Sequence, residues 1–126
     1  MRPWIVLAGL GGMSAVGLGA YGVHGLAGDA AAQALVEQGA GYQLAHCLAL
    51  LAADRLAANP RSGGTRAAHG AALLFVLGMA LFCGSLYLKA IAGLVLPVPM
   101  VTPAGGISLM AGWLVLSIAG WCKSSD

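Results

Sequence analysis

The side chains able to do chemistry are few, and the densest group stands at the start of an apolar stretch, GYQLAHCLALLAADR. In a helix, Tyr42 and Gln43 lie four and three residues before His46, so the three side chains share one face of one turn. The stretch ends on the adjacent charges Asp54 and Arg55, which we expect to pair with each other or with a neighbour. Such groups in a membrane helix must point toward protein rather than lipid.

Composition places these residues in a membrane protein. Hydrophobic residues make up 60% of the 126 residues and charged residues only 8%, whereas about a quarter of an ordinary soluble domain is charged. At about 20 residues per crossing, the length allows one domain with at most four or five spans. The net charge of +2 is small, and we expect no nucleic-acid partner. Cys47, Cys83 and Cys122 lack the spacing of a disulfide framework or a zinc site.

The chain is therefore predicted to be an all-α integral membrane protein, a single domain with four transmembrane helices. The predicted spans are residues 3–23, 41–58, 67–88 and 104–122. The first is free of charge and long enough to cross the hydrocarbon; a cleaved signal peptide is the alternative, and we expect the segment to be retained. The second is the weakest, because only residues 38–53 lack charge, so Arg55 must extend to the headgroups.

Two connections have features of their own. Residues 30–38 predict a short helix, capped by Asp29 and ending near Gly39 and Gly41, which either lies at the membrane surface or continues into the second span. Residues 90–103 contain Pro97 and Pro99 and predict an irregular apolar loop folded onto the bundle or dipping into the interface.

After this loop, Thr102 and Pro103 resemble an N-cap and a first helical residue. Small residues at helical spacing then predict close helix packing in the first and last spans. These stripes are Gly11, Ala15, Gly19 and Gly22, and Gly105, Ser108 and Gly112. The GxGxxG formed by residues 17–22 lacks the strand and the acidic residue of a dinucleotide site, and we interpret it as helix packing.

The placement of cations predicts the orientation. With four spans, five of the six Lys and Arg residues fall on one side and Lys89 falls on the other. The five are Arg2, Arg55, Arg61, Arg66 and Lys123. The positive-inside rule then places both termini in the cytoplasm. His69, beside Arg66 at the cytoplasmic end of the third span, is expected to be a solvated interfacial histidine.

This topology predicts that several polar residues meet in the outer third of the membrane. They are His24, Tyr42, Gln43, His46, Ser85, Tyr87 and Thr102. If the second span starts at residue 41, His46 lies roughly 7 Å below the outer boundary. The group either staples the helices together or binds a headgroup, a quinone carbonyl or a partner subunit. We predict no catalytic residue, metal ligand or cofactor, because no carboxylate or Ser, His and acid set lies at this level.

Five motifs in order resemble a known family. They are GAYGVHGL at 19–26, YQLAH at 42–46, LFCGSLY at 81–87, TPAGG at 102–106 and the Gly112-Trp113 pair. They are similar to domain of unknown function 423, to which the animal transmembrane protein 256 is also similar, and the resemblance covers about residues 17–113. It implies a four-span protein of the bacterial inner membrane without an established activity. It also adds Gly105 and Gly106 of TPAGG to the positions of interest.

We therefore hypothesise a non-catalytic accessory or scaffolding subunit whose polar cluster binds membrane lipid, quinone or a larger membrane complex. A homo-oligomer is left open. The alternative is a small membrane enzyme or transporter that uses His24 and His46 for proton or metal chemistry.

Overall fold

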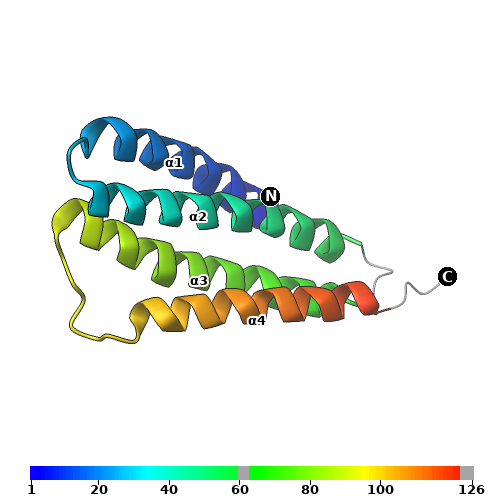
Figure 1. The fold of residues 1–126 in the computed structure, drawn as a ribbon. Coiled ribbons are helices and arrows are strands. Elements are labelled where there is room, and N and C mark those ends of the chain that lie inside the picture. The colour runs from blue at the N-terminus through cyan, green and yellow to red at the C-terminus, as the bar shows by residue number, and fades with distance from the viewer. Residues whose placement is uncertain (60–62, 123–126) are drawn as a thin grey trace.

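The computed structural model describes residues 1–59 and 63–122, and these residues form four α-helices, as predicted (Figure 1). The helices are α1 (Pro3–Gly25), α2 (Ala30–Ala57), α3 (Thr65–Ala92) and α4 (Val101–Trp121). Successive helices run in opposite directions. The α1–α2 and α3–α4 connections lie at one end of the bundle, and α2 ends, α3 begins and α4 ends at the other.

The helices pack mainly in chain order, α1 against α2, α2 against α3 and α3 against α4, while α4 also touches α2. Consequently α2 and α3 form the centre. The largest fully buried side chains come from these two helices: Val36 and Leu50 of α2, and Phe75 and Cys83 of α3.

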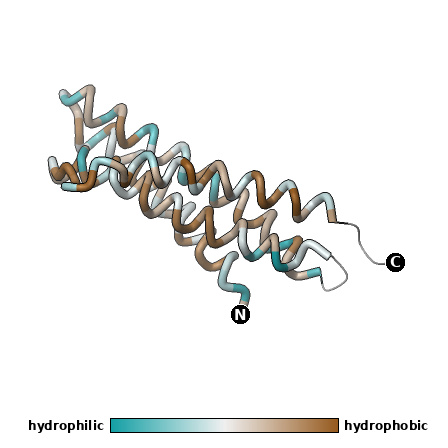
Figure 2. The backbone as a smooth tube through the Cα atoms, turned by 90° about the horizontal axis from the view of Figure 1, so that it is seen from below, coloured by the Kyte–Doolittle hydropathy of each residue, from teal (hydrophilic) through white to brown (hydrophobic). Residues whose placement is uncertain are grey.

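Three of the described helices, α1, α3 and α4, are long and apolar enough to cross a membrane. Only 17 to 28% of their most apolar segments is buried inside the protein, so most of their apolar surface faces outward, as lipid-facing helices require. In Figure 2 the hydrophilic residues gather toward the ends of the tube, and the middle is mainly apolar. The α2 helix is not among the three, because it carries Glu37, Asp54, Arg55 and several uncharged polar residues.

The α2 helix runs without interruption from Ala30, so residues 30–38 are continuous with the helix that follows them, as one of the two predicted alternatives required. Asp29 caps it as predicted, since its carboxylate accepts a hydrogen bond from the Ala32 amide at 3.0 Å. The longer helix changes the position of His46 relative to the start of its helix. That residue lies about 24 Å along α2 at 1.5 Å per residue, rather than one turn and a half from its start.

The proline-rich connection is shorter than predicted. The α3 helix continues to Ala92 and ends at Gly93, whose φ of +65° is a left-handed helix cap. The α4 helix begins at Val101 with Met100 as its N-cap, so the assignment of Thr102 as N-cap was wrong. The Thr102 hydroxyl pairs with Ser85 instead, at 2.6 Å.

Both small-residue stripes pack against neighbouring helices, as predicted. A Cβ at Gly105 would lie 2.4 Å from the backbone nitrogen of Phe82, and one at Gly22 would lie 2.9 Å from Val36. The GxGxxG pattern lies entirely within α1, in contact with α2, which agrees with helix packing.

Candidate functional site between α1 and α3

A hydrogen-bond network centred on Gln43 joins the first three helices. The Tyr87 hydroxyl donates to Gln43 Oε1 at 2.7 Å. The Gln43 amide nitrogen donates to the Gly11 carbonyl and to Ser14 Oγ, each at 2.7 Å. Ser14 Oγ in turn donates to the Gly11 carbonyl at 3.0 Å. We call these four residues the Gln43 network. It couples α1, α2 and α3 through side chains far apart in sequence.

The network lies near the middle of the bundle. Ser14 is the central residue of α1, with eleven helical residues on either side, and Gln43 is at the midpoint of α2. Tyr87 lies near the end of α3, but helical side chains point back toward the helix N-terminus, so its hydroxyl reaches Gln43. Its ring passes Gly39, where a Cβ would lie 2.7 Å away. A glycine at this position therefore makes room for the ring.

Beside the Gln43 network lies a groove of ≈ 370 Å³, which we call the α1–α3 groove. Its lining is mostly apolar, with the polar groups of the Gln43 network among them. The lining residues are Leu7, Gly11, Ser14 and Leu18 of α1, Gln43 of α2, and Val76, Met79, Ala80, Cys83, Gly84 and Tyr87 of α3.

A second network, centred on His46, lies one turn further along α2 and faces α4. His46 Nδ1 lies 2.6 Å from the Tyr42 carbonyl, which can only accept, so Nδ1 carries the hydrogen. His46 Nε2 therefore accepts the hydrogen bond from the Trp113 indole at 3.0 Å. The ring is buried, and its centroid lies 5.6 Å from that of Phe75 and 5.9 Å from that of Trp113. Both ring nitrogens are engaged within the protein.

The remaining predicted residues are placed apart from these two networks. Ser85 and Thr102 pair with each other between α3 and α4. Gly105 is buried against Phe82, and Gly106 lies beside the Phe82 ring. His24 is exposed in the last turn of α1. The predicted polar residues therefore form three separate groups plus His24, rather than one cluster.

Three members of the networks, Gly11, Ser14 and Trp113, were absent from the predicted site, although Gly11 belonged to a predicted packing stripe. The sequence signal for Ser14 is that it is the one Ser or Thr in an apolar helix, at its centre. Trp113 belonged to a family motif, but its position did not indicate its partner. Across residues 1–59 and 63–122, no group of three or more His, Cys, Asp or Glu side chains is arranged to hold a metal ion.

Comparison with known proteins identifies the family. The family model "protein of unknown function (DUF423)" matches residues 18–106. The chain belongs to the DUF423 family. No solved structure matches it.

The relatives of this DUF423 chain include several bacterial membrane proteins. UPF0382 membrane protein SERP0230 of Staphylococcus epidermidis is 37% identical, over 94% of the chain and 95% of the relative. UPF0382 membrane protein YwdK of Bacillus subtilis is 31% identical, over 94% and 96%. UPF0382 inner membrane protein YgdD of Escherichia coli is 34% identical, over 93% and 88%. Together with the apolar helices, these matches make the chain a multi-pass protein of the bacterial inner membrane.

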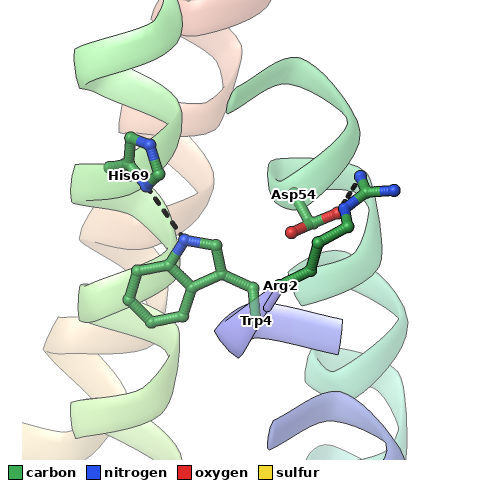
Figure 3. Close-up of polar contacts among 4 residues, drawn as sticks. All are labelled: Arg2, Trp4, Asp54 and His69. Atoms are coloured by element: carbon green, nitrogen blue, oxygen red, sulfur yellow. Dashed lines mark hydrogen bonds and ion pairs between the residues drawn. The ribbon is translucent and has the colours of Figure 1, made fainter. Parts of the chain in front are cut away.

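Two polar contacts hold the start of α1 in the DUF423 chain, at the opposite end of this helix from His24; Figure 3 shows both. Arg2 forms an ion pair with Asp54, so the partner of this buried carboxylate is Arg2 rather than Arg55. The Trp4 indole donates to His69 Nδ1 at 2.9 Å, which links α1 to α3. His69 is exposed, as expected, but it also has this partner. Of the five cations that predict the orientation, Arg61 and Lys123 lie outside the described residues.

Proposed function

We propose that this DUF423 protein is a non-catalytic membrane subunit that binds a lipid-soluble molecule in the α1–α3 groove. The observation that carries the proposal is the position of the Gln43 network. It lies at the midpoints of α1 and α2 and borders a groove with apolar walls. Polar groups are costly at membrane depth and most often mark a functional site. An amphiphile with an apolar body and a polar end matches this lining. A protein that binds such a molecule without converting it acts as an accessory or scaffolding subunit.

The membrane arrangement we propose has four spans with both termini in the cytoplasm. Because α2 packs between α1 and α3 and is as long as α3, a membrane crossed by those two helices also contains α2. The described cations support the orientation. Arg2, Arg55 and Arg66 lie at the end of the bundle that holds the N-terminus, and Lys89 lies toward the other.

The geometry favours binding over the alternative of proton or metal chemistry at His24 and His46. A metal or a transferred proton would need a free lone pair on His46, and Nε2 already accepts from Trp113. His24 lies in the last turn of α1, whereas His46 lies well inside α2. The two histidines are therefore at different levels of the bundle.

The proposal is tested by filling the α1–α3 groove. Leu7→Trp enlarges a side chain that lines this groove, and Gly84→Leu adds one where a Cβ meets no atom within 4 Å. Gly84 also borders a neighbouring groove, so Leu7→Trp is the more specific variant. Gly17→Leu is the matched control, because its Cβ also meets no atom and it lies outside the groove.

The measurement is native mass spectrometry of protein extracted in a mild detergent, with identification of bound molecules. We expect a lipid-soluble molecule on the wild-type protein and on Gly17→Leu, and its loss from both groove variants. Equal retention by all four proteins, or its absence from the wild type, rules the proposal out.

A further inference from the structure

The Gln43 network has used all of its hydrogen-bond donors. Gln43 has two amide hydrogens, which go to Gly11 and Ser14. The single hydroxyl hydrogens of Ser14 and Tyr87 go to the Gly11 carbonyl and to Gln43 Oε1. The orientation of the Gln43 amide is fixed, because the Gly11 carbonyl can only accept and must face nitrogen.

What the network retains is acceptor capacity. A hydroxyl oxygen and an amide oxygen each have two lone pairs. Gln43 Oε1 accepts one bond, from Tyr87, and the Tyr87 oxygen donates without accepting from any described residue. Both residues line the α1–α3 groove. A molecule in this groove therefore meets oxygens that can accept a hydrogen bond. Among the lining side chains, the hydrogen left to donate one is the weakly donating thiol hydrogen of Cys83.

From this imbalance we infer that the groove takes a phenolic hydroxyl, as carried by a lipid hydroquinone, in preference to the corresponding quinone. The inference rests on the proposed function and specifies its ligand. A hydroquinone donates through its hydroxyls, whereas the quinone offers only carbonyl oxygens, which would face the acceptors of Gln43 and Tyr87. An acceptor facing an acceptor loses the hydrogen bonds that it would make elsewhere.

The surroundings of the network suit an aromatic ring. Gly84 has no side chain, and a Cβ there would meet no atom within 4 Å, so a flat ring can approach the α3 backbone. The Met79 thioether and the Tyr87 ring line the same groove. Sulfur–aromatic and ring–ring contacts both favour an aromatic ligand. The central position of the network also suits a ring that lies within the membrane rather than a phosphate group at its surface.

The test compares two forms of one molecule. A decyl-substituted benzoquinone and its hydroquinone, kept reduced under argon, are titrated into the wild-type protein in lipid nanodiscs. Empty nanodiscs and the Leu7→Trp protein give the background from partition into lipid. One additional hydrogen bond corresponds to about tenfold in affinity. We therefore expect the hydroquinone to bind at least about tenfold more tightly than the quinone.

A variant of Gln43 tests whether the network sets this preference. Gln43→Met removes the acceptor of the Tyr87 hydroxyl, which is then free to donate to a quinone carbonyl. The preference for hydroquinone should shrink or reverse in this variant and should persist in Gln38→Met, an exposed position on the same helix.

The outcomes separate the two proposals. If the wild type binds the quinone as tightly as the hydroquinone, or more tightly, the inference is wrong and the proposed function stands. If neither form binds above background, the inference is wrong, and the mass-spectrometric comparison of the groove variants decides the proposed function by itself.

Discussion

The two halves of the bundle pack differently. Between α3 and α4 the contact reaches the backbone, because Gly105 lies against the Phe82 nitrogen and Ser108 donates to the Leu74 carbonyl at 2.8 Å. Between α1 and α2 the glycines mostly meet side chains or open space. A Cβ at Gly11 would meet the Cys47 sulfur, and one at Gly17 would meet nothing within 4 Å.

Two grooves border α1: the α1–α3 groove on one side and a groove of ≈ 580 Å³ between α1 and α2 on another. A third groove, of ≈ 420 Å³, lies along the last turns of α3 and its connection to α4. A helix bordered by two grooves can shift with little loss of packing, whereas close backbone contacts resist shifting. The comparison indicates that α2, α3 and α4 form a fixed frame and that α1 is the part able to adjust to a ligand.

The largest loss of stability is expected where α2 packs against α3 and α4. His46→Ala removes a buried ring, creates a cavity beside Phe75 and leaves the Trp113 indole without its acceptor. We expect a loss of about 3 kcal/mol in the free energy of unfolding. Unfolding in mixed micelles of increasing SDS content, followed by circular dichroism, measures it. Leu48→Ala, at an exposed position on the same helix, is the control and should change little. A loss below about 1 kcal/mol would show that the contacts of His46 do not hold α2 in the frame.

A pair of glycine substitutions tests the comparison directly. Gly105→Ala forces a Cβ against backbone, which cannot rotate away, and should cost about 2 kcal/mol. Gly11→Ala would place a Cβ 2.6 Å from the Cys47 sulfur, which belongs to a side chain and can shift, so it should cost about 1 kcal/mol, at the low end for overpacking. Gly120→Ala meets no atom and should change the free energy of unfolding by less than about 0.5 kcal/mol. The same SDS titration applies, and equal losses for Gly105→Ala and Gly11→Ala would contradict the division into frame and adjustable helix.

The sequence predicted the helical class, the four helices, the Asp29 cap and the packing of the small-residue stripes. These features depend on composition and on local spacing, which a single chain displays directly. The sequence left open whether residues 30–38 form a separate helix, because Gly39 and Gly41 resemble a helix end. The reason for a glycine at position 39 is the Tyr87 ring of another helix.

The site was predicted less well, because its members are joined by tertiary contacts. Gln43 and Tyr87 were both predicted, yet their direct bond depends on how α2 and α3 pack. Ser14 was missed, since a lone serine in an apolar helix commonly bonds its own backbone, as this one also does. The pairing of His46 with Trp113 depends on the approach of α4 to α2. Local spacing does not encode that approach.

The smallest effect is expected at the contact that holds the start of α1. Trp4→Phe keeps an aromatic ring but removes the hydrogen bond to His69, and an interhelical bond in a membrane protein contributes about 0.6 kcal/mol on average. Trp121→Phe is the matched control, because Trp121 is 89% exposed. If α1 is the adjustable helix, Trp4→Phe should increase amide hydrogen exchange in the first turns of α1 and leave α3 and α4 unchanged. Faster exchange spread over all four helices would show instead that α1 is part of the frame.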